Sequence, residues 1–300
     1  MAKIFHIGQR KTGTTWLQEV LTDAAEKEDF TFCFTPLVRW WQEQQDNVRQ
    51  ESGADYDALK EIFRSHLDER VFFTMENLIQ IDHAFLVNLI YEVCPDAIIL
   101  VTTRSPKGYL QSSLFNALIG GNMREIERFY ENFPRRHMIR THDLLGLKNA
   151  IKARFGSNQL RLLPYELLRD SPDEHLRVVS RLLGVDVTPY KKATRRNASP
   201  NPAILQLTYS MNEKLRQTAP DILASDEWRV FKHLALNAAA HAEELQQQFD
   251  QHLINKEFSV PEAKLPDDVL AKMPTMLKPL ASHNLYQSYL EEYGLTADED

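Results

Sequence analysis

The sequence contains few cysteines and no long apolar run. Its 300 residues include two cysteines, Cys33 and Cys94, which lie far apart in the chain. Two isolated cysteines exclude a disulfide framework, lack the spacing of metal ligands and suit a reducing compartment. No apolar stretch reaches the length of about 18 residues that a membrane-spanning helix needs, and the N-terminus has no signal-peptide core. We therefore expect a cytoplasmic protein that does not span a membrane.

Repeats, low-complexity blocks and Gly/Ser-rich linkers are also missing from the sequence. With 43% apolar and 26% charged residues, the composition argues against disordered and fibrous proteins. We predict a single domain over residues 1–300, in which residues 1–200 form a nucleotide-binding α/β core and residues 201–300 a helical extension. The loop over residues 187–202 is the best candidate for a boundary or a lid.

The charge is modest and unevenly distributed. A formal net charge of −7 argues against binding of nucleic-acid polymers. Residues 95–200 nevertheless contain eighteen Lys or Arg and ten Asp or Glu, so this third carries +8. A site for a small polyanion would produce such an excess, and so would a chance gathering of surface arginines.

Apolar runs of strand length alternate with amphipathic segments over the first two thirds of the chain. The predicted strands cover residues 3–8, 31–34, 71–75, 97–101 and 160–163, and the predicted helices cover residues 14–27, 55–67, 82–93, 143–155 and 173–183. A polar stretch covers residues 42–51. Continuous apolar strands between helices predict an α/β fold, a three-layer parallel sheet covered on both faces. Beyond residue 202 helical segments such as 237–253 dominate, and we expect a helical C-terminal third packed on the sheet.

The segment GQRKTGTT, residues 8–15, follows the first predicted strand and precedes a predicted helix. It matches the phosphate-binding pattern G-x-x-x-x-G-K-[ST], except that Thr14 stands where the pattern has lysine. Such loops surround phosphate with backbone N–H groups, and the arrangement predicts a topology like that of the P-loop NTPases. Because Lys11 lies inside the loop, the pattern favours a single 5′-phosphate that carries a non-phosphate group. A chance pair of glycines after a strand is the alternative.

Two later segments add groups that suit a phosphate ligand. TTRSPKGYLQSS contains Arg104 at the end of a buried strand, followed by Ser112, and RLLPYELLRDSP contains Tyr165. An arginine at the carboxyl end of a parallel strand lies where open α/β sheets bind ligands, and its guanidinium matches a phosphate monoester. A surface salt bridge is the alternative role for Arg104.

Together with KTGTTW, residues 11–16, these segments resemble the sulfotransferases that use 3′-phosphoadenosine 5′-phosphosulfate (PAPS) as co-substrate. The resemblance covers residues 3–200 and implies that Arg104 and Ser112 hold the 3′-phosphate, while Trp16 and Tyr165 contact the adenine. The residues that it assigns to the phosphosulfate loop are Arg10, Lys11, Thr12, Gly13, Thr14 and Thr15.

The resemblance also assigns the basic loop KKATRRN. This loop, residues 191–197 with Arg195, Arg196 and Asn197, is expected to close over the 3′-phosphate. A solvated basic turn is the alternative for the loop, and a core position is the alternative for Trp16.

Sulfuryl transfer to an alcohol needs a proton acceptor and a cation beside the leaving oxygen. Lys11 can supply the cation. Glu76 directly follows the predicted strand over residues 71–75, and it resembles the glutamate base of the glycan-modifying and bacterial branches of the family. Partial burial would raise the pKa of Glu76 toward neutrality. Glu76 as a helix N-terminal carboxylate and His83 as the base are the alternatives, whereas His6, inside a strand, is expected to be a core residue.

The acceptor implied by the resemblance is a small molecule, a glycan or a lipid. The segment RWWQEQQ, residues 39–45, and the C-terminal third are expected to shape its pocket. The histidines have no ligand spacing, so no metal is assigned. Two other functions stay open: a P-loop kinase or GTPase, which would need the missing loop lysine, and a nucleotide-binding protein without catalytic activity.

Overall fold

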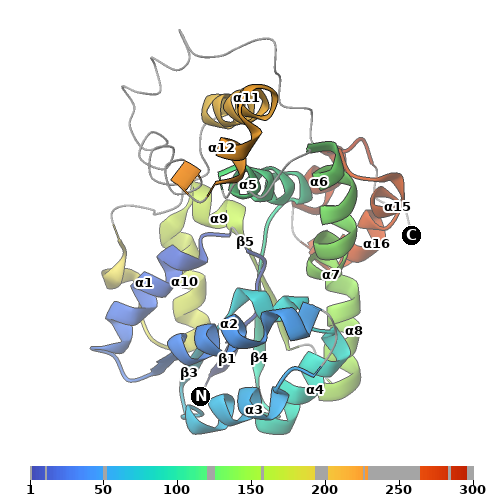
Figure 1. The fold of residues 1–300 in the computed structure, drawn as a ribbon. Helices are drawn as coiled ribbons and strands as arrows, with labels where there is room; N and C mark the ends of the chain where they lie inside the picture. The colour runs from blue at the N-terminus through green and yellow to red at the C-terminus, as the bar shows by residue number, and fades with distance from the viewer. Residues whose placement is uncertain are drawn as a thin grey trace. The chain divides into compact units, whose positions relative to one another are not determined.

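The computed structural model shows an α/β fold built on one parallel β-sheet (Figure 1). It describes residues 2–10, 12–49, 53–119, 126–156, 159–192, 202–225, 227–228, 264–282 and 285–295. The strands are β1 (Lys3–His6), β2 (Thr31–Cys33), β3 (Val71–Thr74), β4 (Ile98–Thr103) and β5 (Leu160–Pro164). They lie in the order β2-β3-β1-β4-β5, and every neighbouring pair is parallel. The predicted α/β class with a parallel sheet is confirmed.

Helices connect the strands and make up most of the remaining described chain. The α-helices are α1 (Thr14–Ala25), α2 (Thr35–Arg49), α3 (Tyr56–Ser65), α4 (His83–Val93), α5 (Pro106–Ile119), α6 (Ile126–Phe133), α7 (Ile139–His142), α8 (Leu144–Phe155), α9 (Tyr165–Asp170), α10 (Pro172–Leu183), α11 (Pro202–Thr218), α12 (Pro220–Ala224), α15 (Asp267–Leu270), α16 (Met273–Leu277) and α17 (Leu285–Glu291). The shorter turns are the 3₁₀ helices η1 (Glu76–Gln80), η3 (Thr188–Tyr190) and η4 (Lys278–Ser282) and the π-helical turn η2 (Pro134–Met138).

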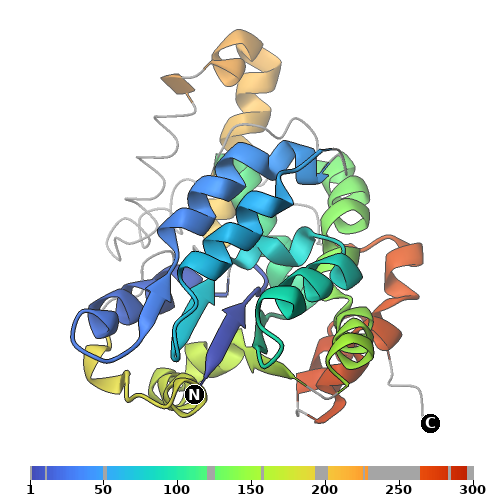
Figure 2. The ribbon, with the colours of Figure 1, turned by 90° about the horizontal axis from the view of Figure 1, so that it is seen from below.

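Successive residues of a strand point to opposite faces of the sheet, so each face presents its own apolar side chains. Helices pack on both faces. On one face, Ile4 of β1 belongs to an apolar cluster with Trp16 of α1 and Leu176 of α10. On the other face, the rings of Phe5 and of Phe63 in α3 meet edge to face with their centroids 5.0 Å apart. Figures 1 and 2 show α1 and α10 side by side at one side of the strands, away from α4 and α8. The sheet is therefore the middle of three layers.

The five predicted strands each match an observed strand to within two residues at either end. Residues 42–49 of the polar stretch, for which no element was predicted, belong to α2. Leu37, Trp40 and Trp41 are buried and anchor α2, while its Gln and Glu residues are good helix formers. The predicted helix over residues 237–253 lies outside the described residues.

Contacts between residues divide the chain into two compact units. The first comprises Met1–Pro106, Arg136–Asn197 and Asp268–Asp300, and the second comprises Lys107–Arg135 and Ala198–Asp267. In the first unit α16 packs on α8, so part of the C-terminal third covers the core as expected. In the second unit the Asn212 side-chain N–H of α11 donates to the carbonyl oxygen of Leu118 in α5 (3.5 Å). The assignment of the whole chain to one domain stays a prediction.

The cysteines and the apolar character of the helices can be compared with the expectations from composition. Cys33 and Cys94 are both free and buried. Among the described helices, none combines the length and the apolar character needed to cross a bilayer.

Candidate functional site

The strand register brings the predicted site residues to one edge of the sheet. His6 of β1 pairs with Thr74 of β3, so the loop that starts at Gly8 and the segment that starts at Glu76 leave their strands at the same level. Neighbouring strands in a sheet lie about 4.8 Å apart. Thr103 of β4 pairs with Pro164 of β5, and the next residue of each strand is a predicted site residue, Arg104 or Tyr165.

Gly13 shapes the turn from the phosphate loop, residues 8–13, into α1. It is the N-cap of α1, with φ 75° and ψ 17° in the left-handed region that favours glycine. A Cβ atom at this position would lie 2.2 Å from Leu168 Cδ2 of α9. Because glycine offers no side chain to cap the helix, the first N–H groups of α1, from Thr14 onward, are left for another acceptor. A helix start of this kind binds phosphate well.

Gln9 fastens the phosphate loop to β4 and α7. Its side chain is fully buried, and its amide N–H donates to the carbonyl oxygen of Thr141 (3.1 Å). Its amide oxygen accepts the backbone N–H of Arg104 (2.8 Å). The backbone N–H of Gln9 donates to the carbonyl oxygen of Thr102 (2.9 Å). The loop and the Arg104 backbone are thus held by one side chain, which the sequence pattern missed because Gln9 occupies a position where any residue is allowed.

Arg104 stacks on Tyr165 across the ends of β4 and β5. The guanidinium carbon lies 4.6 Å from the centroid of the Tyr165 ring. Burial lowers the pKa of Arg104, although a guanidinium stays charged at any physiological pH. A guanidinium held against a ring keeps one orientation and is weakly hydrated, which suits recognition of a phosphate.

Glu76 and His83 lie beyond β3. Glu76 is half-buried and is the first residue of η1, so its place also agrees with the alternative of a helix N-terminal carboxylate. The preceding residue, Met75, donates its N–H to the carbonyl oxygen of His6 (3.0 Å), which ties this segment to β1. His83 begins α4 and is 9% exposed, and burial lowers its pKa.

The remaining predicted residues fall into three groups. Thr12 and Thr14 are buried in the loop and at the start of α1, whereas Arg10 and Thr15 are exposed. Ser112 is half-buried in α5 within the second unit. Four residues lie outside the described part of the chain: Lys11, Arg195, Arg196 and Asn197.

Trp16 is a core residue in this structure. It is 1% exposed, and its indole N–H donates to the carbonyl oxygen of Lys192 (3.3 Å). This agrees with the alternative of a core position, and a contact of Trp16 with adenine stays a prediction.

Comparison with known proteins identifies the family. The sequence profile described as "Sulfotransferase family" matches residues 3–189, which is more than half of the chain. The chain belongs to the sulfotransferase family. Its resemblance to sulfotransferases, inferred from the loop and the later segments, is thereby confirmed.

Two solved structures are similar to this sulfotransferase at low identity. The sulfotransferase from Alicyclobacillus acidocaldarius is 17% identical with a TM-score of 0.46, and the match covers 82% of this chain and 99% of that one. Mouse sulfotransferase SULT7A1 complexed with PAP is 15% identical with a TM-score of 0.45, and the match covers 98% of this chain and 89% of that one. No curated protein matches the chain significantly.

Helix α17 contacts the segments that carry the candidate site residues Arg104 and Tyr165. The Tyr289 hydroxyl donates to one carboxylate oxygen of Glu166 (2.5 Å), and the other accepts the backbone N–H of Ser105 (3.3 Å). Burial first, and then the Glu166 carboxylate, raise the pKa of Tyr289. Glu166 and Ser105 directly follow Tyr165 and Arg104, so α17 holds the backbone beside the stacked pair. No sequence pattern predicts this contact, because the last hundred residues match no motif.

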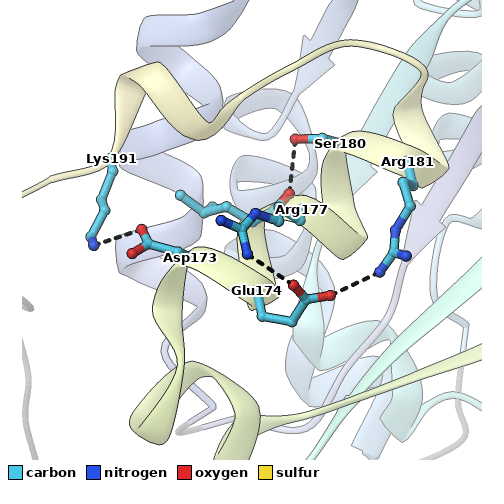
Figure 3. Close-up of polar contacts among 7 residues, drawn as sticks. Asp173, Glu174, Arg177, Ser180, Arg181 and Lys191 are labelled. Atoms are coloured by element: carbon cyan, nitrogen blue, oxygen red, sulfur yellow. Dashed lines mark hydrogen bonds and ion pairs between the residues drawn. The ribbon is translucent and has the colours of Figure 1, made fainter.

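The described start of the basic loop runs beside α1 and α10. The Tyr190 hydroxyl donates to Glu28 (2.6 Å), which lies just after α1. Lys192 pairs with Asp23 in the last turn of α1. The Lys191 ammonium pairs with Asp173 at the start of α10 (2.6 Å; Figure 3). The carbonyl oxygen of Lys192 also accepts from Trp16, so the described start of the loop lies beside the N-terminal part of α1. Closure of the rest of this loop over a nucleotide stays a prediction.

A surface pocket on α10 is separate from the site. Its volume is about 520 Å³, and it is lined mainly by α10 and the turn after it, including Ser180, Gly184 and Asp186. Glu174 accepts hydrogen bonds from both Arg177 (3.2 Å) and Arg181 (3.0 Å), so both guanidinium groups of the pocket are paired with the same carboxylate (Figure 3). None of its lining residues belongs to the phosphate loop or to the strand ends that carry Glu76 and Arg104.

The described residues also bear on metal binding. Within the described ranges, no group of three or more His, Cys, Asp and Glu side chains is arranged to hold a metal ion.

Proposed function

We propose that this sulfotransferase moves a sulfuryl group from PAPS to a hydroxyl or amine of a small-molecule, glycan or lipid acceptor. The observation that carries the proposal is the link from the phosphate loop through Gln9 to Arg104. PAPS has a phosphate on each side of its ribose. A loop for the 5′-phosphosulfate and a guanidinium for the 3′-phosphate, joined by one buried amide, would keep the spacing between the two anion contacts constant.

The stacked pair suits the nucleoside end of the same ligand. Arg104 approaches the ring of Tyr165 from the end of β4, and Tyr165 Cε2 would lie 3.8 Å from a Cβ atom at Gly13. The loop, the guanidinium and the aromatic ring are therefore close neighbours at one edge of the sheet. We assign the 3′-phosphate to Arg104 and Ser112, the adenine to Trp16 and Tyr165, and the outer side of the 3′-phosphate to Arg195, Arg196 and Asn197.

In the proposed reaction Glu76 accepts the proton of the acceptor group as that group attacks sulfur. A bond forms between sulfur and the acceptor atom, and the bond between sulfur and the bridging oxygen of the 5′-phosphate breaks. The electron pair of that bond stays on the phosphate, so the products are the sulfated acceptor and 3′-phosphoadenosine 5′-phosphate (PAP). Lys11 and the N–H groups at the start of α1 stabilise the negative charge on the leaving phosphate.

In the proposed step the lysine and the loop N–H groups supply the positive charge beside the leaving oxygen, and no metal ion takes part. Alignment of acceptor, sulfur and leaving oxygen, together with charge stabilisation, is most of what such a transfer asks of a protein.

Transfer of labelled sulfate from PAPS tests the proposal, with wild type, Lys11→Ala and Glu76→Gln measured on a panel of hydroxyl and amine acceptors. Exposed controls of the same residue types are Lys152→Ala and Glu61→Gln. We expect Lys11→Ala and Glu76→Gln each to lower kcat by at least about 100-fold, as expected for loss of a charge-stabilising group or a general base. The two controls should retain wild-type rates.

Three other results would contradict the proposed mechanism or favour an alternative function. Undiminished transfer by both site variants would overturn the mechanism. Mg²⁺-dependent hydrolysis of ATP or GTP would favour the kinase or GTPase alternative. Tight binding of PAP without turnover on any acceptor would favour a nucleotide-binding protein without catalytic activity.

A further inference from the structure

A chain of buried polar side chains connects β3, β1, β4 and the phosphate loop. His6 Nδ1 lies 2.8 Å from the Thr74 hydroxyl oxygen, and His6 Nε2 lies 3.1 Å from that of Thr102. The Thr102 and Thr12 hydroxyl oxygens are 2.8 Å apart, and the Thr12 hydroxyl donates to the carbonyl oxygen of Gln9 (2.7 Å). The four side chains of this polar chain, His6, Thr12, Thr74 and Thr102, are each about 1% exposed.

The protons in the polar chain have one consistent order. The carbonyl oxygen of Gln9 can only accept, so it takes the single hydroxyl proton of Thr12. Thr12 must then accept from Thr102, and Thr102 must accept from His6 Nε2. Burial lowers the pKa of His6 to about 3, with a smaller contribution from His175, so the ring is neutral and has one proton. That proton is on Nε2, and Nδ1 accepts from Thr74.

Gly8 allows the polar chain to form. A Cβ atom at Gly8 would lie 1.9 Å from Thr102 Oγ1, 2.8 Å from Thr102 N and 3.0 Å from His6 Nε2. Only a residue without a side chain lets the loop pass this close to both groups. The first glycine of the phosphate pattern is therefore explained here by the hydrogen bond between His6 and Thr102.

We propose that His6 is a positioning residue of the sulfotransferase site: as a neutral imidazole protonated on Nε2, it holds the phosphate loop and the end of β3 in a fixed relation. On one side it reaches Thr12 through Thr102, and the Thr12 hydroxyl donates to the carbonyl oxygen of Gln9 in the phosphate loop. On the other side it holds Thr74, two residues before Glu76. Its effect on catalysis rests on the proposed function, whereas its tautomer and its hold on the loop do not.

Nuclear magnetic resonance of wild-type protein labelled with ¹⁵N in its histidines tests the proton order directly. The His6 signals are assigned by their loss in the His6→Gln variant. We expect the pattern of a neutral ring protonated on Nε2, unchanged between about pH 5 and pH 8, because the ordinary pKa of histidine is near 6.5 and burial lowers it. A ring protonated on Nδ1, or a charged ring at pH 7, would overturn the proposal.

Matched variants test the hold on the loop. Thr102→Val removes a hydroxyl from the polar chain, and the control Thr22→Val removes a hydroxyl of α1 that donates to the carbonyl oxygen of Gln18 in the same helix (2.8 Å). Loss of the two buried hydrogen bonds of Thr102, to His6 and to Thr12, predicts about tenfold weaker PAP binding for Thr102→Val in calorimetry, and less than about twofold for Thr22→Val. In the protein without ligand, the amide resonances of Gly8 and Gly13 should shift in Thr102→Val only.

Two substitutions of His6 separate its two contacts. Glutamine can retain the contact on the Nε2 side, toward the loop, and asparagine can retain the contact on the Nδ1 side, toward Thr74. His6→Gln should therefore keep more of the PAP affinity and more of the wild-type loop resonances than His6→Asn. Equal losses in both folded variants would reduce His6 to a general structural role and overturn the proposal.

The outcomes also separate this inference from the proposed function. If wild type fails to bind PAP but the tautomer and loop resonances behave as expected, the ligand assignment fails and the polar chain stands. If wild type binds PAP and transfers sulfate but Thr102→Val leaves the loop resonances unchanged, the proposed role of His6 is wrong and the proposed function stands.

Discussion

The guanidinium carbon of Arg104 lies 4.6 Å from the centre of the Tyr165 ring, and these two residues directly follow neighbouring strands of the sheet. A second stacked pair of the same kind occurs in the first unit, where Arg154 of α8 lies 4.4 Å from the ring centre of Tyr91 in α4. The two pairs are chemically alike. They differ in that the Arg104 backbone is bonded to the phosphate loop through Gln9.

Arg104→Ala should weaken PAP binding by about 10- to 100-fold, the range expected when a charge-assisted hydrogen bond to phosphate is lost. Binding of adenosine 5′-phosphate, which has no 3′-phosphate, should change much less. Titration calorimetry with both nucleotides measures the two effects.

Arg154→Ala serves as the matched control for Arg104→Ala, because it removes an equivalent cation–π contact and should leave PAP affinity unchanged. If Arg104→Ala weakened both nucleotides equally, Arg104 would not be the group that recognises the 3′-phosphate.

Gly13 and Gly184 form a matched pair for substitution by alanine. Both have positive φ, 75° and 73°, but only Gly13 has a neighbour where the Cβ atom would be, since nothing lies within 4 Å at Gly184. Gly184→Ala should lower the free energy of unfolding by about 1–2 kcal/mol, the cost of left-handed backbone for a residue with a Cβ atom. Gly13→Ala should cost about 1–3 kcal/mol more, because Leu168 must move.

Urea unfolding of the two glycine variants gives the comparison, and PAP affinity gives an independent one. Only Gly13→Ala should impair PAP binding. Equal stability losses would show that Leu168 adapts to the added methyl group at no cost.

Tyr289→Phe should destabilise the protein by about 1–3 kcal/mol, because Glu166 loses a buried hydrogen-bond donor. It should also weaken PAP binding several-fold, since Glu166 holds the backbone of Ser105 beside Arg104. The control is Tyr286→Phe on the same helix, which removes a hydroxyl that donates to the carbonyl oxygen of Pro274 (2.9 Å).

Thermal unfolding and calorimetry of both tyrosine variants provide the measurement. Tyr286→Phe should cost stability without changing PAP affinity. A similar effect of both variants on PAP binding would argue against a specific role for the contact between α17 and Glu166.

Two buried histidines make stability depend on pH. Burial lowers the pKa of His6 to about 3 and that of His142 to about 4. In the unfolded chain each titrates near 6.5, so below that pH the unfolded state binds protons that the folded state does not. The free energy of unfolding should therefore fall as the pH decreases from about 7 to about 5, by about 2 kcal/mol for each histidine.

Urea unfolding of wild type and His6→Gln at these two pH values checks the sign and the size of this effect. The variant should start from a lower stability, and its decrease between the two pH values should be about 2 kcal/mol smaller because one titrating group is gone. An identical decrease in both proteins would mean that His6 is already protonated in the folded state at the lower pH.

The sequence alone determined the strands, the phosphate loop and the family. Each of these depends on neighbouring residues: an apolar run reads as a buried strand, and two glycines between a strand and a helix read as a phosphate turn. The same local patterns predicted no element for residues 42–49, where Trp40 and Trp41 earlier in α2 supply the buried contacts that keep a polar segment helical.

Only the tertiary structure decided which residues hold the site together. Gln9, Thr102, Glu166 and Tyr289 are far apart in the chain. The first three lie within residues 3–200, which resemble the family, but no pattern singles out these positions, and Tyr289 lies in no motif. Their contacts exist because the strand order places β1 between β3 and β4, and because α17 returns to the end of β5. A hydrogen bond between residues 93 or 123 positions apart depends on the paths of every element between them, which no local pattern encodes.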